Sequence, residues 1–179
     1  MKSPLLICLT AAIAWATPAS AQTSLPAMQV KDMNGAMHDL RSLADSNHLT
    51  IISFWATWCG PCIKELDQIM QVYEEWQSKY SAKLIAISVD DSRNSRKVKP
   101  MVIGRGWKYE VLMDENQDLA RAMNVNNPPM TFLVNRKGQI VYTHQGYVPG
   151  AEDELEKKLQ EAAGLGLKQN HFHRYNLKR

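Results

Sequence analysis

Cysteine is scarce in this sequence, which has three cysteines among its 179 residues. They are Cys8, Cys59 and Cys62, and three cysteines can close at most one disulfide within a chain. A fold held together by a framework of several disulfides, as in many small secreted domains, is therefore excluded. Cys59 and Cys62 have two residues between them, a spacing found in redox sites, in halves of zinc sites and in structural disulfides.

A large net charge is also missing. The chain has 21 basic and 18 acidic residues, a formal net charge of +3. Without residues 1–21, in which Lys2 is the one charged residue, the balance is 20 minus 18, or +2. So small an excess gives no reason to expect binding to nucleic acid or to a membrane surface. Basic residues do gather between 93 and 105, either as a docking surface for an acidic partner or, as we favour, as a solvated helix face.

No apolar run has the roughly 20 residues that a membrane span needs. The run at 5–15 follows Lys2 and precedes small residues at 19–21, which is the pattern of a signal peptide with its cleavage site. We therefore expect residues 1–21 to be a signal peptide and the protein to be exported; the alternative is an uncleaved membrane anchor. Cys8 has too few residues before it for a complete export signal, so we do not expect it to carry a lipid.

The rest of the chain has the composition of one globular domain. The full sequence is 45% hydrophobic and 22% charged, which is enough apolar content for one core. We expect a single domain at 22–163 and a basic tail at 164–179. His171 and His173 in that tail could bind a metal, but histidines near a chain end are usually solvated, so we predict no metal site.

Apolar periodicity predicts an α/β fold. The expected strands are a hairpin at 28–39 that turns at 32–35, and single strands at 49–55, 83–89, 109–113, 130–134 and 139–143. The expected helices are 40–44, 63–80, 92–106 with an interruption at Pro100, 115–123 and 152–163. The helix at 63–80 has an apolar stripe toward the core, and its polar residues are expected to face outward: Lys64, Glu65, Gln68, Glu74 and Glu75.

The cysteine pair lies between the strand at 49–55 and the helix at 63–80. The first turn of a helix offers free N–H groups and the positive end of the helix dipole, which lower the pKa of a thiol. Cys59 is so placed and is the predicted nucleophile. Cys62 lies one helical turn deeper, where it can attack a mixed disulfide formed by Cys59. This predicts dithiol–disulfide exchange, with the Cys59–Cys62 disulfide as the redox group and no other cofactor.

Three segments make the sequence resemble a known family. They are 54–62, which contains the Trp-Cys-Gly-Pro-Cys motif, then 84–90, and 129–134 followed by Lys137 and Gly138. The chain resembles the thioredoxin superfamily, and within it the secreted TlpA/ResA-like thiol-disulfide oxidoreductases, over residues 27–163. The resemblance implies a thioredoxin fold: a central mixed β-sheet flanked by helices, with an N-terminal hairpin and a central βα insertion.

The resemblance also implies a substrate site beside the cysteines. In the superfamily a cis-proline lies against the CxxC pair, and Pro129 is the matching position. Trp58, Gly60, Pro61 and Pro128 would complete the substrate-binding surface. Pro128 has no N–H to donate, so we expect substrate to contact its carbonyl oxygen, its ring and the Trp58 side chain.

The resemblance leaves the proton acceptor open, because Ser53 stands where many thioredoxins have a buried acid. Asp91 falls, by rough alignment, where TlpA/ResA-like proteins often carry a glutamate. It is therefore a candidate general base for Cys62, with a simple helix cap as the alternative. We expect Trp55 in the core and Trp58 as an exposed apolar rim for protein substrates.

The resemblance favours a reductase, because the Gly60-Pro61 dipeptide resembles that of reducing members. A reductant in an oxidising compartment must be recharged, which implies a membrane electron donor of the DsbD/CcdA type. The expected protein is exported, periplasmic or otherwise extracytoplasmic, and reduces disulfides of protein substrates. Cytochrome c maturation is one role that the family suggests.

Three alternatives remain open. A disulfide oxidant or isomerase would share these residues and differ in redox potential. A copper-handling protein would use Cys59, Cys62 and a histidine such as His144 as soft ligands. A binding module would keep the Cys59–Cys62 bond as a structural disulfide.

Overall fold

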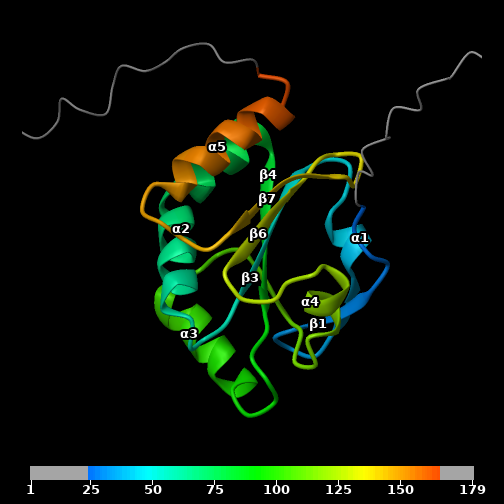
Figure 1. The fold of residues 1–179 in the computed structure, drawn as a ribbon, viewed down its shortest axis with the longest axis vertical. Helices are drawn as coiled ribbons and strands as arrows, with labels where there is room; N and C mark the ends of the chain where they lie inside the picture. Colours follow the sequence, from blue (N-terminus) through cyan, green and yellow to red (C-terminus); the bar gives the residue numbers. More distant parts are fainter. Residues whose placement is uncertain (1–23, 166–179) are drawn as a thin grey trace, which may run out of the picture.

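The structure is a computed structural model and describes residues 24–165. The expected signal peptide at 1–21 and almost all of the expected tail, with His171 and His173, lie outside the described residues. A seven-stranded β-sheet runs through the described part and carries helices on both faces (Figure 1).

Seven strands and five α-helices follow one another in nearly the predicted order. The strands are β1 (Gln29–Asp32), β2 (Met37–Asp39), β3 (Leu49–Trp55), β4 (Ala82–Ser88), β5 (Glu110–Met113), β6 (Met130–Val134) and β7 (Ile140–Gln145). The helices are α1 (Leu40–Leu43), α2 (Gly60–Tyr80), α3 (Val98–Arg105), α4 (Asp118–Ala122) and α5 (Ala151–Ala162), with a short 3-10 helix, η1 (Ser95–Lys97), before α3.

The strand order is β2-β1-β5-β4-β3-β6-β7. The central strands β3, β4 and β5 are parallel, because α2 and α3 carry the chain back across one face between them. The outer strands are antiparallel, with the β1–β2 hairpin on one side and the β6–β7 hairpin on the other. This mixed sheet confirms the predicted thioredoxin fold.

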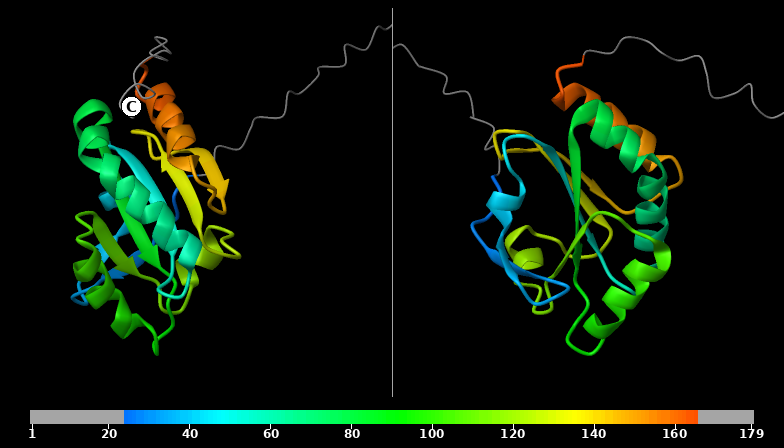
Figure 2. Two further views of the ribbon diagram at one scale, coloured as in Figure 1. Left: turned by 90° about the vertical axis from the view of Figure 1, so that its left-hand side faces the viewer. Right: turned by 180° about the vertical axis from the view of Figure 1, so that it is seen from behind.

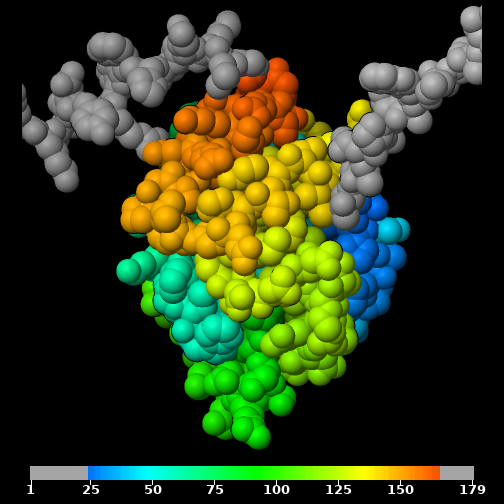
Figure 3. All heavy atoms as spheres, viewed as in Figure 1, coloured from blue at the N-terminus to red at the C-terminus, as the bar shows by residue number. Residues whose placement is uncertain are grey.

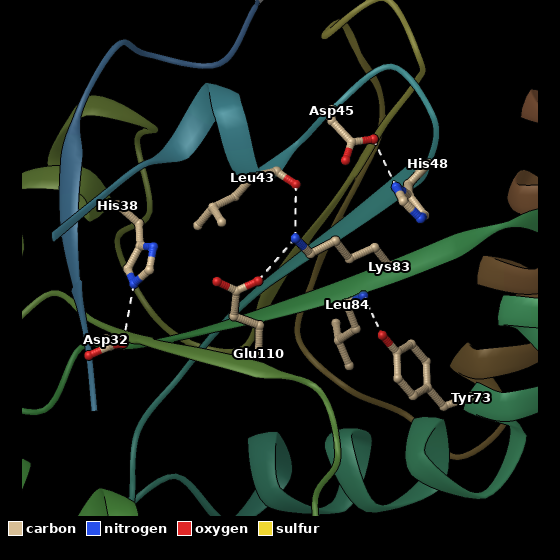
Figure 4. Close-up of polar contacts among 9 residues, drawn as sticks. All are labelled: Asp32, His38, Leu43, Asp45, His48, Tyr73, Lys83, Leu84 and Glu110. Carbon is tan, nitrogen blue, oxygen red and sulfur yellow. Dashed lines mark hydrogen bonds and ion pairs between the residues drawn. The ribbon is translucent and has the colours of Figure 1, made fainter. Parts of the chain in front are cut away.

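Helices α2, α3 and α5 lie on one face of the sheet, and α1 and α4 lie on the other (Figures 1 and 2). All seven residues of β3 are buried, as expected for a central strand covered on both faces. Polar contacts tie the strand ends to their neighbours: Lys83 of β4 lies 3.0 Å from Glu110 of β5 and donates to the carbonyl of Leu43 at the end of α1 (Figure 4).

Two helices differ from their predicted bounds for a reason that the structure shows. The predicted helix at 115–123 begins only at Asp118, because Gln117 adopts a left-handed conformation with φ of 57°. The predicted helix at 92–106 begins as η1 and continues as α3, in which Pro100 lies in the first turn. Proline is tolerated there because first-turn N–H groups have no partner within the helix, so α3 continues past Pro100.

Within residues 24–165, no helix combines the length and the apolar content needed to cross a membrane.

Candidate active site at the N-terminus of helix α2

Cys59 and Cys62 form a disulfide at the start of α2, with their Cα atoms 5.3 Å apart. Strand β3 ends at Trp55, and a short loop carries the chain to Cys59, which is the N-cap residue of α2. The Cys62 N–H donates to Cys59 Sγ over 3.3 Å. Cys59 keeps 6% of its surface exposed and Cys62 keeps none. An incoming disulfide can therefore approach Cys59 but not Cys62.

The loop before Cys59 is fixed by Asp90, which is fully buried just after β4. The Thr57 N–H donates to Asp90 Oδ2 over 2.8 Å, and the Thr57 hydroxyl donates to Oδ1 over 2.6 Å. The Ser88 hydroxyl also donates to Oδ2, over 2.9 Å. Sequence reasoning missed this residue, although its place at the carboxyl end of a central parallel strand is where α/β sheets carry their sites.

Asp91, the predicted general base, lies on the surface, unlike the buried Asp90. It is exposed and accepts hydrogen bonds from the N–H groups of Arg93, at 3.1 Å, and Asn94, at 3.0 Å. These contacts close the turn before η1 and agree with the alternative interpretation of Asp91 as a cap. The structure offers another acid for the role.

That acid is Glu65, and the prediction that it lies on the outer face of α2 is wrong. Glu65 is 5% exposed, and its Oε1 lies 2.8 Å from the hydroxyl of Thr131 in β6. Thr131 in turn lies 3.2 Å from the hydroxyl of Ser53 in β3. The buried face of α2 is wider than its apolar stripe, because the β3–β6 pair offers hydroxyl groups beneath it. The sequence carries no signal for this burial, because the hydroxyl groups of Ser53 and Thr131 come together only in the folded sheet.

Burial raises the pKa of Glu65 to about 7, because the apolar surroundings penalise the charged form. The hydrogen bond from Thr131 opposes this, and the nearby carboxylate of Glu152 adds to it. Side chains three apart on a helix are neighbours, with Cβ atoms about 5–6 Å apart. Glu65 and Cys62 are so related, and both are buried on α2. A carboxyl that exchanges its proton near neutral pH thus lies beside the deeper cysteine.

The peptide bond between Pro128 and Pro129 is cis, as the resemblance implied. Pro129 is buried and Pro128 half-buried. The Gly146 N–H donates to the Pro129 carbonyl over 2.9 Å, which holds the loop after β7 against this segment.

The start of α2 reaches the surface among three other segments. Figure 3 shows its teal atoms bordered by the orange segment after β7, the yellow-green segment before β6 and the green segment around α3. Trp58 is 62% exposed, and Val148, in the orange segment, is 63% exposed. Trp55 is fully buried and packs edge-on against Trp107, with ring centroids 5.0 Å apart. The predicted contrast between Trp55 and Trp58 is thus confirmed.

The copper alternative has no support in the described part of the chain. No group of three or more histidine, cysteine, aspartate or glutamate side chains is placed to hold a metal ion there. His144 lies in β7, with its ring stacked on Tyr142 at a centroid distance of 6.3 Å.

The basic residues of 93–105 lie on the surface around α3, and Arg105 is paired with Asp67 of α2.

A mixed sheet with helices on both faces and a CxxC disulfide at a helix N-terminus define a redox protein of thioredoxin fold. Residues 21–143 match the model of the AhpC/TSA family, and the chain belongs to that family. It is similar to sporulation thiol-disulfide oxidoreductase A of Bacillus subtilis, with 29% identity over 67% of this chain and 72% of that protein. It is equally similar, at 29%, to the thiol-disulfide oxidoreductase ResA of Bacillus thuringiensis, over 65% of this chain and 64% of that one.

Solved structures of similar fold support this assignment. An uncharacterized thioredoxin-like protein from Porphyromonas gingivalis is 45% identical, with a TM-score of 0.71 over 84% of this chain and 97% of that chain. StoA from Bacillus subtilis is 26% identical, with a TM-score of 0.59 over 75% of this chain and 99% of that chain. Together, the fold, the cysteine pair and these relatives place the chain among the thiol-disulfide oxidoreductases.

Proposed function

We propose that this protein is an exported reductase of disulfides in protein substrates. The observation that carries the proposal is the asymmetry of the pair: Cys59 is the N-cap residue of α2 and reaches solvent, whereas Cys62 is fully buried. In the reduced protein the helix dipole favours the Cys59 thiolate. This thiolate attacks a substrate disulfide, releases one substrate thiolate and forms a mixed disulfide. Cys62 then attacks Cys59 and releases the second thiolate.

Cys62 must lose its proton before it attacks, and Glu65 is the proposed acceptor. A general base is most effective when its pKa is near the working pH. The pKa of about 7 for Glu65 meets this condition. Its position on α2, three residues beyond Cys62, puts the two side chains within reach of each other. Asp91, with its contacts in the turn before η1, is not needed for this step.

The direction of electron flow rests on the sequence. Gly60 and Pro61 resemble the dipeptide of reducing members, and the signal-peptide pattern at 1–21 supports export to the periplasm or a similar compartment. Electrons would come from a membrane donor of the DsbD/CcdA type, and cytochrome c maturation is one setting for the reaction. A redox titration against glutathione separates this from the oxidant and isomerase alternatives, which require a higher potential.

Substrate docking is proposed to use Trp58 and the half-buried Pro128. Replacing Trp58 with alanine removes an exposed aromatic ring, and such anchors contribute on the order of 1–2 kcal/mol to a protein interface. Trp58→Ala should therefore raise KM for insulin about 5–30-fold, with a small change in kcat. Its rate with a small aromatic disulfide should change much less. An equal effect on both substrates would show that Trp58 acts on the cysteines rather than on docking.

Covalent capture tests the function directly. Cys62→Ser should hold substrate proteins on Cys59 as mixed disulfides, which dithiothreitol releases. Cys59→Ser is the matched control, because it keeps one cysteine but removes the exposed one, and it should capture nothing. If Cys62→Ser captures no protein and Cys59→Ser retains full function, the disulfide is structural and the binding-module alternative holds.

A further inference from the structure

A cavity of about 10 Å³ lies behind Glu65, between α2, the β6–β7 hairpin and the start of α5. The lining residues with polar side chains are Glu65, Thr131, Tyr142, His144 and Glu152. This volume is about the room that one water molecule needs. Glu65 Oε2 and Glu152 Oε2 are both buried, and among the described residues neither has a hydrogen-bond partner. Two unpaired carboxylate oxygens therefore border one water-sized space.

A buried polar atom without a hydrogen-bond partner destabilises the folded protein, so two such atoms at one cavity call for a shared partner. A single water can donate one hydrogen bond to each carboxylate. The Thr131 hydroxyl already donates to Glu65 Oε1, so it makes no demand on this water. The Glu152 carboxylate raises the pKa of Glu65, after burial itself, which shows that the two groups sense each other. Glu152 is half-buried in the first turn of α5, so it also meets solvent.

We propose that Glu152, acting through one water molecule in this cavity, is the exit by which the proton on Glu65 reaches solvent. The inference rests on the proposed function. Glu65 takes the proton of the Cys62 thiol and then passes it to the water. The water gives one of its own protons to Glu152, which releases it to solvent directly or through His144. No electrons move in these steps, and one proton leaves for each Cys62 thiolate formed.

The other titratable groups around Glu65 do not compete for this proton. Tyr142 of β7 lines the cavity, and Tyr147 and Tyr109 interact electrostatically with Glu65. Burial raises the pKa of all three tyrosines. They remain neutral across the working pH range. Glu152 and His144 are thus the remaining groups lining the cavity that can accept a proton.

Glu152→Gln keeps the shape of the side chain and removes its carboxylate. The pKa of Glu65, followed by carboxyl infrared or NMR titration of the oxidised protein, should fall by about half a unit to one unit. A lower pKa leaves more Glu65 ionised at pH 7 and thus able to accept a proton, which by itself would not slow the reaction. Because the exit for the proton is lost, single-turnover reduction of insulin in weakly buffered solution should nevertheless slow on the order of tenfold. Added imidazole should restore the rate, because it can collect the proton directly. Asp153→Asn, which removes the same charge from the exposed neighbouring residue, should change neither quantity appreciably.

An unchanged Glu65 pKa and an unchanged rate in Glu152→Gln would overturn the proposal, as would a slow rate that imidazole does not restore. His144→Ala tests the last step, and a smaller, imidazole-restored slowing supports a route through the histidine. The titration of Glu65 uses the oxidised protein and needs no substrate. A failure of capture by Cys62→Ser would therefore remove the proposed function without altering the titration, so the two failures are distinguishable.

Discussion

Glu65→Gln should stabilise the folded protein at pH 8 by about 3 kcal/mol and leave its stability nearly unchanged at pH 4. The carboxyl has an ordinary pKa of 4.5, and burial raises it to about 7 in the folded state. Between these values the unfolded chain releases the proton while the folded protein keeps it, so wild-type stability falls as pH rises from 4.5 to 7. Above pH 7 the folded protein carries the full cost of ionising the buried Glu65 carboxyl, and each unit of pKa shift corresponds to about 1.4 kcal/mol. Glutamine does not ionise, so the variant avoids this cost.

Urea unfolding of the oxidised proteins between pH 4 and 8 measures this difference. Glu74→Gln is the matched control, because Glu74 is an exposed residue of the same helix, paired with Lys108. An exposed pair contributes little, so the stability of this variant should stay close to that of wild type and should not rise toward high pH. A difference between Glu65→Gln and wild type that does not vary with pH would mean that Glu65 ionises normally despite its burial.

The same substitution should slow reduction of disulfides. General bases typically contribute 10²–10⁴-fold to a rate, so single-turnover reduction of insulin by Glu65→Gln at pH 7 should fall by roughly 100-fold. Formation of the mixed disulfide at Cys59 should be nearly unchanged, because Glu65 is proposed to act on Cys62. Greater stability and lower activity in one variant are expected when a destabilising buried charge serves the reaction. Slowing of the first step instead would place Glu65 in the activation of Cys59.

The sequence was sufficient to predict the strands, the long helix and the place of the cysteine pair, because these depend on local periodicity and on the chemistry of a helix N-terminus. It was not sufficient for Glu65. A helical pattern assigns faces by hydrophobicity, so a glutamate beside an apolar stripe is placed outward. Its burial depends on Thr131 and Ser53, which meet beneath α2 only once β3 and β6 pair.

Which of Asp90 and Asp91 is buried could not be predicted from the sequence, for a related reason. Both residues follow the same predicted strand, and adjacent side chains at a strand end point in opposite directions. The buried one of the two is decided by where β4 ends and by the approach of Thr57 from the loop after β3. A shift of one residue in the end of the strand would exchange their roles.

Asp90→Ala should destabilise the protein by about 2–4 kcal/mol and loosen the loop that leads to Cys59. The substitution removes the acceptor for the Thr57 N–H, the Thr57 hydroxyl and the Ser88 hydroxyl. Each donor left unpaired in a buried site lowers the free energy of unfolding by about 1–3 kcal/mol, although the two hydroxyl groups can turn toward other acceptors. Urea unfolding of the oxidised protein measures the loss. Asp90→Asn keeps an acceptor for the Thr57 N–H, so it should recover at least half of the stability.

Asp91→Ala provides the matched control for this prediction, since it removes the same side chain from the next residue. Asp91 is exposed and accepts from the N–H groups of the turn before η1, so its loss should lower stability by about 0.5–1 kcal/mol. The rate at which iodoacetamide alkylates reduced Cys59 reports on the conformation of the loop that leads to it. Asp90→Ala should change this rate several-fold and Asp91→Ala should not, because Asp90 alone of the two bonds to the loop residue Thr57. Equal losses of stability in the two variants would show that Asp90 does not hold the active-site loop.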